Sequence, residues 1–298
     1  MEQVKITFLG TANAVPTEKR NHTAILVEKA DERILIDCGE GTQRQFKFSG
    51  NNPVKLTRLL ITHWHGDHVL GIPGLFQTLA MSGYNKTLRI HGPPNTAHNI
   101  QLMERIFKDF KIIAEVKENS GIVFENSNFK IEALPMNHGT PTYAYSITYK
   151  DKRRLKKSKL KKYNLPNSPI LKELQEGKDI VWNGKKIKSK DISYLEKGRK
   201  VAVILDTAFN ENAVKIALNS DILIAEATFA KEEKQKAAEY KHLTAWDAAK
   251  IAKKAKVKKL ILTHLSQRYE HNPSIIEKEA RKIFKNTKLV KDLDVISL

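Results

Sequence analysis

Four potential metal ligands are packed into six positions that follow a short apolar run near residue 60. They are His63, His65, Asp67 and His68. Four such groups side by side are unfavourable in a protein core, because each must be hydrogen-bonded when it is buried. A divalent metal does use them, since imidazole nitrogens and carboxylate oxygens are the usual ligands of zinc. In a loop that leaves a strand, the first two histidines can point one way and the other two residues another, so the spacing allows two metals.

Further acidic or histidine residues occur where other strand-like apolar runs end. They are Asp37, His138, Asp206, Glu226 and His264. Because strand ends on one edge of a sheet layer converge, we expect these side chains to line one cleft together with the cluster above. The pattern indicates a binuclear metal hydrolase. Asp37 is expected to be a hydrogen-bond acceptor near the metals and not a ligand.

Hydrophobic periodicity and turn residues predict the elements that carry these positions. Strands are expected at residues 4–9, 24–27, 33–36, 58–61, 88–91, 129–136, 143–149, 201–205, 222–225 and 259–262. Helices are expected at residues 42–48, 75–81, 100–107, 211–218, 245–255 and 274–284. The segment from residue 150 to 200 is expected to be basic and irregular.

The charge balance is strongly basic, with 52 Lys and Arg against 33 Asp and Glu and a net charge of +19 in 298 residues. Such a charge favours a polyanionic partner such as nucleic acid, although a lysine-rich host proteome would produce the same excess. The single cysteine, Cys38, excludes an internal disulfide framework. The first residues lack the basic-then-apolar pattern of a signal peptide, and no apolar run approaches membrane-spanning length. We therefore expect a cytoplasmic protein without a membrane partner.

Several segments in order resemble the ribonuclease Z family of the metallo-β-lactamase superfamily, the endonucleases that trim the 3′ trailer from precursor tRNA. The segments are FLGTANAVPTEKRN, ILIDCGEGTQRQ, LLITHWHGDHVLGIPGL, AEATF, the His242-Leu243-Thr244 triplet and LILTHLSQRY. The resemblance implies an α/β fold, a four-layer αββα metallo-β-lactamase sandwich. Residues 1–149 and 201–298 would form the catalytic domain, and residues 150–200 an inserted basic arm that binds tRNA. It also implies a homodimer.

The resemblance further implies two Zn²⁺ ions per chain and assigns their ligands. His63, His65 and His138 would hold one ion, Asp67, His68 and His264 the other, and Asp206 would bridge them. A hydroxide made at such a pair attacks phosphorus. Asp67 would accept the water's proton, and His242, poised by Glu226, would protonate the leaving ribose oxygen.

Substrate contacts are expected from two regions and one isolated serine. The residues are Lys19, Arg20, Asn21, Lys152, Arg153, Arg154, Lys156, Lys157 and Ser266. The arm segment KDKRRLKKSKLKK concentrates positive charge, which suits phosphate neutralisation. The remaining histidines are expected to be surface or capping residues: His22, His91, His98 and His271.

Two places depart from the family pattern. Ala225 stands where the family typically has histidine, and Ala208 and Phe209 stand where it tends to have arginine and proline. Two alternatives remain open: another hydrolase on the same fold, such as a small-molecule phosphodiesterase, thioesterase or lactonase, and a non-catalytic RNA-binding protein. The complete set of seven ligands argues against the second alternative.

Overall fold

The computed structural model describes residues 3–107 and 112–298 of the chain. The chain divides into two compact units. The first contains the described residues of 1–124, 131–147 and 200–298, and the second contains residues 125–130 and 148–199. Each unit has its own hydrophobic core, so each is described by itself.

The first sheet of the structure joins the amino-terminal strands and the last strand of the chain. Its order is β18 (Val295–Ser297), β1 (Lys5–Gly10), β2 (Ala24–Lys29), β3 (Glu32–Ile36), β4 (Arg58–Leu60), β5 (Thr87–His91) and β6 (Ile113–Lys117). Pairing is antiparallel from β18 to β3 and parallel from β3 to β6. The carboxyl ends of β3 and β4 therefore lie at one edge.

The second sheet joins the central and carboxyl-terminal strands. Its order is β17 (Thr287–Leu289), β16 (Lys259–Thr263), β15 (Ile222–Glu226), β14 (Lys200–Ile204), β9 (Tyr143–Tyr149), β8 (Phe129–Pro135) and β7 (Gly121–Glu125). The strands from β14 to β17 are parallel neighbours. Their carboxyl ends also share one edge.

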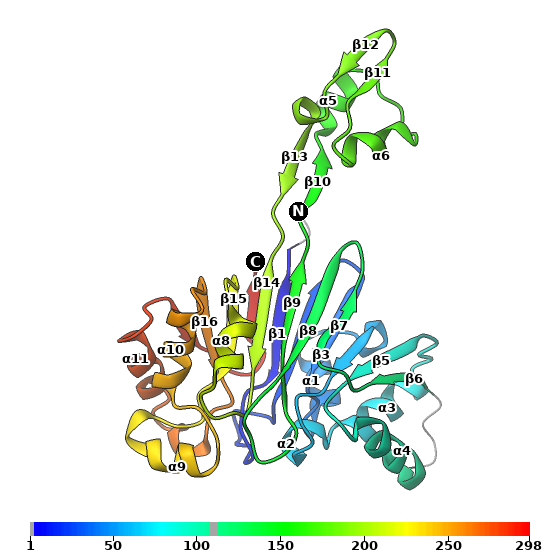
Figure 1. Cartoon of the computed structure of the whole chain (residues 1–298). Helices are drawn as coiled ribbons and strands as arrows, with labels where there is room; N and C mark the ends of the chain where they lie inside the picture. The colour runs from blue at the N-terminus through cyan, green and yellow to red at the C-terminus, as the bar shows by residue number, and fades with distance from the viewer. Residues whose placement is uncertain (1–2, 108–111) are drawn as a thin grey trace. The chain divides into compact units, whose positions relative to one another are not determined.

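Helices cover the outer face of each sheet (Figure 1). The first sheet is covered by helices that follow its strands: α1 (Thr42–Phe48), α2 (Gly66–Val69), α3 (Ile72–Met81) and α4 (Thr96–Phe107). The second is covered by α8 (Glu211–Ala217), α10 (Ala245–Lys254) and α11 (Ser274–Arg281), and α9 (Lys234–Glu239) precedes α10 in the chain. Short 3₁₀ helices lie at Pro53–Lys55, Lys231–Glu233 and Gln267–Tyr269.

The alternation of side chains along the strands shows why two sheets must stack. Leu35 and Leu59 belong to the cluster under α1 and α3, whereas their neighbours Ile34 and Leu60, also fully buried, point to the opposite face. In the second sheet Ala202 packs under the helices, and Val203 is buried on the other face. Both sheets are thus buried on both sides, which confirms the expected αββα sandwich.

The second unit is a small α/β structure, so the expectation of an irregular segment is wrong. Its elements are β10 (Lys152–Leu155), α5 (Lys157–Lys162), α6 (Ile170–Gln175), β11 (Ile180–Trp182), β12 (Lys185–Ile187), α7 (Ser189–Ile192) and β13 (Ser193–Glu196). The strands form two antiparallel pairs, β10 with β13 and β11 with β12. Leu174, Ile180, Ile187 and Ile192 form its buried core. The dense lysines hide these widely spaced apolar residues from a periodicity argument.

Every strand expected from the sequence is present, with ends that differ by at most two residues. The periodicity does not predict β6, β7, β17 and β18, which are the short edge strands of the two sheets and have partly exposed side chains. The prediction of surface histidines is wrong for His22 and His91, which are 6% and 3% exposed. Burial, the largest effect, lowers the pKa of His91 to about 4, so its ring is neutral and buried at the end of β5. Among the described residues, none of the helices has the length and apolar character needed to cross a membrane.

The core of the second unit gives a stability prediction. Leu174→Ala should destabilise this unit by about 2–5 kcal/mol, because Leu174 is fully buried and its removal leaves a cavity. Hydrogen exchange of the Ile180 and Ile187 amides should become faster, while that of the β1–β4 amides stays as in the wild type. Val181→Ala is the control, since Val181 lies next to Ile180 on β11 but is 68% exposed. Unchanged exchange at Ile180 and Ile187 would show that Leu174 does not hold the unit together.

Candidate metal centre

The candidate site forms where parallel strands of the two sheets end. Asp37 directly follows β3, Glu226 is the last residue of β15, and His264 directly follows β16. Asp37 and His264 both have positive φ, 56° and 59°, a left-handed conformation that is uncommon for residues other than glycine. The chain thus turns sharply at both positions, which aims these side chains at the sheet edge.

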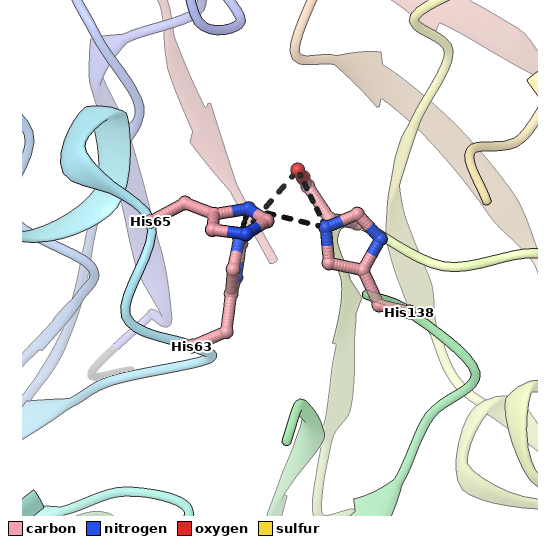
Figure 2. A group of neighbouring side chains, drawn as sticks. His63, His65 and His138 are labelled. Atoms are coloured by element: carbon pink, nitrogen blue, oxygen red, sulfur yellow. Dashed lines mark hydrogen bonds and ion pairs between the residues drawn. The ribbon is translucent and has the colours of Figure 1, made fainter. Parts of the chain in front are cut away.

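The first group of ligand atoms comes from three histidines and Asp206 (Figure 2). His65 Nδ1 lies 3.1 Å from His63 Nε2 and 3.2 Å from His138 Nε2. The Asp206 Oδ2 atom lies 3.6 Å from His63 Nε2 and 3.8 Å from His138 Nε2. These four atoms surround one point, as the ligands of a single cation do.

A second group lies on the other side of the same carboxylate and contains Asp67, His68, His264 and Asp206. His68 Nε2 is 3.2 Å from His264 Nε2 and 3.2 Å from Asp67 Oδ2. Asp206 turns its other oxygen, Oδ1, to this group, at 3.4 Å from His68 Nε2 and 3.2 Å from His264 Nε2. One carboxylate therefore faces both groups, which is the arrangement of a bridging ligand.

Asp37 sits behind His68 and receives three hydrogen bonds. The backbone N–H and the hydroxyl of Thr62 each donate to it at 2.7 Å, and His68 Nδ1–H donates at 2.6 Å. The same Thr62 hydroxyl accepts a hydrogen bond from His63 Nδ1–H at 3.0 Å. Asp37 is thus a buried acceptor that orients two of the histidines, as the sequence predicts.

Two further candidate ligands, His138 and His264, are oriented in the same way. His138 Nδ1–H donates to the Lys241 carbonyl at 3.1 Å. His264 Nδ1–H donates to the Thr228 hydroxyl at 2.9 Å, and that hydroxyl donates to Glu226 Oε2 at 2.5 Å. Metal-binding histidines characteristically donate their second N–H to such partners.

The donor set fits a pair of cations. A histidine that donates from Nδ1 has only a lone pair at Nε2, and these lone pairs point at one another and at carboxylate oxygens. Facing lone pairs repel unless a proton or a cation lies between them. Asp206 Oδ1 is also a buried oxygen without a hydrogen-bond donor in the described structure. The seven residues would hold two metal ions, each with nitrogen and oxygen ligands.

The protonation of the cluster follows from burial and charge. Burial, then the neighbouring His68, holds the pKa of His63 well below its usual range, so its ring is neutral, as a metal ligand must be. Burial alone would also lower the pKa of His68, but the carboxylates of Asp206 and Asp37 outweigh it and raise that pKa well above its usual range. The cluster therefore retains a proton when no cation compensates its carboxylates.

His242 and Glu226 form a pair beside these groups. Glu226 is fully buried, and its Oε1 and Oε2 atoms lie 3.1 and 3.0 Å from His242 Nδ1. The Thr207 N–H donates to Glu226 Oε1 at 2.8 Å, which fixes the carboxylate. Burial alone would lower the pKa of His242, but Glu226 and Asp206 raise it to about 9. His242 Nε2 lies 3.8 Å from Asp206 Oδ2, so the protonated ring borders the metal centre.

The expected substrate contacts in the loop after β1 have different surroundings. Arg20 is buried, and its guanidinium donates to the Thr11 hydroxyl at 2.7 Å and to the Val290 carbonyl at 2.8 Å. Asn21 donates from its side chain to the Glu40 carbonyl at 2.7 Å. These contacts give both residues a structural role, whereas Lys19 is exposed. Ser266 is buried at the start of the 3₁₀ helix Gln267–Tyr269.

The expected contacts in the second unit also divide into two kinds. Lys152, Lys156 and Lys157 are exposed. Arg153 instead donates to the Ser193 hydroxyl at 3.0 Å, and Arg154 donates to Glu196 at 2.6 Å. The two arginines therefore link β10 to β13, and the three lysines present their charge to solvent.

Thr62 and Thr228 are the site residues that sequence reasoning missed. Each places one hydroxyl between a ligand histidine and a buried carboxylate. Their neighbours in the sequence give a weak signal, since Thr62 precedes the first histidine of the cluster and Thr228 lies in the AEATF segment. A threonine at a strand end is too common to be singled out without coordinates.

Comparison with known proteins decides the family. The chain is 37% identical over 306 residues to ribonuclease Z of Enterococcus faecalis, covering 99% of this chain and 97% of that protein. It is 38% identical over 303 residues to ribonuclease Z of Methanothermobacter thermautotrophicus, with 99% and 97% covered. The chain belongs to the ribonuclease Z family. It is therefore a metal-dependent endoribonuclease on a metallo-β-lactamase fold.

The chain is also similar to solved structures and to one further family model. The crystal structure of human tRNase Z, short form (ELAC1), matches with a TM-score of 0.72 and 26% identity over 98% of both chains. The metallo-β-lactamase fold protein YhfI from Bacillus subtilis matches with a TM-score of 0.73 at 20% identity, covering 100% of both chains, which shows the shared fold. Residues 4–158 also match the family model of the anti-Pycsar protein Apyc1.

The hydrogen bonds to Asp37 lead to a prediction about metal affinity. Asp37→Asn should weaken metal binding by about 10- to 100-fold, because an amide cannot accept from Thr62 and His68 as the carboxylate does. Competition against a series of chelators would measure the affinity. Asp31→Asn is the control, since Asp31 is exposed in the turn between β2 and β3. Wild-type affinity in Asp37→Asn would mean that the carboxylate does not support the ligands.

Proposed function

We propose that this protein removes the 3′ trailer from precursor tRNA and leaves a 3′ hydroxyl on the tRNA. The carrying observation is the site itself: two groups of metal ligands share Asp206, and the His242–Glu226 pair borders them. The full-length match to ribonuclease Z proteins supports this substrate over those of other hydrolases with the same fold.

The metals are proposed to be two zinc ions per chain. Imidazole and carboxylate ligands suit zinc, and the seven residues provide enough of them for two ions with open positions. When bound, such a pair lowers the pKa of a water and offsets charge on the phosphoryl oxygens.

The side chains supply the proton transfers. Asp67 accepts a proton from the attacking water as the new oxygen–phosphorus bond forms. His242 donates its Nε2 proton to the ribose O3′ as the bond between phosphorus and O3′ breaks. Glu226 keeps His242 protonated and fixes its ring through Nδ1. Because a bound cation would offset the charge of Asp206, Glu226 is the carboxylate that holds the proton on His242.

The basic arm is proposed to bind the tRNA, with Lys152, Lys156 and Lys157 as its exposed cations. Lys19, which is exposed, and Ser266, which follows His264 by two residues, are proposed as further substrate contacts. We also propose that the protein acts in the cytoplasm and as a homodimer. The single buried cysteine suits a reducing compartment.

Cleavage of an end-labelled precursor tRNA tests the function and the role of His242. The wild type should cut once, at the 3′ end of the tRNA, and a chelator should abolish the cut. His242→Ala should slow it by about 10²–10⁴-fold, the range expected when a general acid is lost. A phosphodiester with an activated aryl leaving group needs no proton and should be hydrolysed at a near-normal rate.

His98→Ala is the control for this test, because His98 is an exposed histidine on α4. Equal losses of His242→Ala on RNA and on the aryl substrate would point to a structural role for His242. An intact precursor after incubation with the metal-loaded wild type would refute the proposed function.

Charge removal tests the arm. Replacing Lys152, Lys156 and Lys157 by glutamine should weaken precursor tRNA binding and flatten its salt dependence. Each lost phosphate contact should reduce the slope of log affinity against log salt by about 0.7–0.9. A charge-matched control replaces Lys86, Lys215 and Lys285, which are exposed in the first unit. An identical salt slope in the arm variant and the wild type would leave the arm as a solvated surface only.

A further inference from the structure

A pocket of about 550 Å³ lies between α9, α10 and the loop that follows β14, and His242 forms part of its wall. Phe209 comes from the loop, Lys234 from α9, and Asp247, Lys250 and Lys254 from α10. Its volume falls within the range of small-ligand sites, about 300–1,000 Å³. His242 is the residue that this lining shares with the candidate site, and none of the seven candidate metal ligands is among the lining residues.

Phe209 presents an aromatic surface to this pocket. Its side chain is 36% exposed, and Lys254 Nζ lies 5.0 Å from the centroid of its ring. A single exposed apolar residue is ordinary on a protein surface. Phe209 differs because its ring shares a concave wall with the proposed proton donor and with three lysines.

The charge of the pocket is positive. Lys234, Lys250 and Lys254 face one acid, Asp247, whose carboxylate already accepts from the Thr244 hydroxyl at 2.7 Å. Lys250 Nζ lies 3.7 Å from Asp247 Oδ1, and Lys254 Nζ lies 3.6 Å from Glu211 Oε1. Such long, exposed ion pairs contribute little to stability, so a phosphate can replace them at small cost.

We propose that this pocket binds the nucleoside on the 5′ side of the scissile phosphodiester, with its base stacked on Phe209. The inference rests on the proposed function, in which His242 donates its proton to the O3′ of that nucleoside. A ribose with its O3′ at His242 must place its base and its own 5′ phosphate within one nucleotide of the ring. The pocket that His242 lines offers an aromatic face for the base and lysines for the phosphate. Aromatic and cationic groups in this combination are typical of single-stranded nucleic acid sites.

A cycle of variants and substrates tests the proposal. Wild type and Phe209→Ala would each be given a precursor tRNA with a normal or an abasic nucleotide immediately 5′ of the cut. Removing either the base or the ring should lower kcat/KM by about 5- to 150-fold, the usual effect of one base–aromatic stack. Removing both should cost no more than removing one, because they lose the same interaction. Phe209→Tyr should retain wild-type activity within about twofold.

Phe48→Ala is the matched control. Phe48 is also an exposed phenylalanine under a cation, with Arg44 4.7 Å from its ring centroid, but it lies on α1 and outside the pocket. It should cleave both substrates like the wild type. Metal content and melting temperature of Phe209→Ala should match the wild type, which would show that the fold and the ligands are intact.

A binding measurement keeps the pocket testable without cleavage. A mature tRNA that ends in 2-aminopurine riboside would be added to the protein, and stacking on Phe209 should quench its fluorescence. Phe209→Ala should lose the quenching, and Phe209→Tyr and Phe48→Ala should keep it. Equal quenching with and without the Phe209 ring, or additive losses in the cleavage cycle, would overturn the pocket proposal. Failure of the wild type to cut either RNA would instead overturn the proposed function, and the fluorescence result would then decide the pocket.

Discussion

The candidate metal centre depends on one buried carboxylate that faces two groups of histidines. Asp206 is 3% exposed, and its two oxygens lie within 3.2–3.8 Å of ring nitrogens from both groups. Burying a carboxylate alone would be costly, so its place is stable only with protonated histidines or cations around it. The strand before it supplies the rigidity, since β14 lies beside β15 in parallel register. The same register brings Glu226, at the end of β15, to the edge of the sheet where β14 ends and Asp206 follows.

That the candidate ligands share one cleft could be predicted from the sequence, because most of them follow strand ends. His63, His65, Asp67 and His68 are close in sequence, and one loop is enough to bring them together. His138 and His264 are far away in the chain, and both follow strands of the second sheet, His264 after β16, which is parallel to β15, and His138 after β8. What sequence could not give was the support behind the ligands. The Thr62 and Thr228 hydroxyls become significant only once their distances to histidine and carboxylate are known.

The basic arm shows where charge misleads a sequence argument. Its lysines suggest a solvated, irregular segment, yet Leu174, Ile180, Ile187 and Ile192 are enough to close a small core. Because this core orders the strands and helices of the unit, the exposed lysines are carried on fixed elements. Arg20 is the opposite case. It lies in a loop expected to contact the substrate, but its guanidinium donates hydrogen bonds to Thr11 and Val290 inside the fold. Composition predicts neither outcome, because both depend on which atoms meet in the folded chain.

The departure at Ala225 is explained by the alternation of β15. Glu226 points to the site and contacts His242, so the side chain before it points to the opposite face of the sheet. There Ala225 is buried in the cluster formed with α10, among small residues such as Ala248 and Ala252. A histidine at this position would therefore have to fit against the helix layer and could not join the Glu226–His242 pair from its side of the strand. Alanine leaves that pair intact, and the helix packs closely on the strand that carries it.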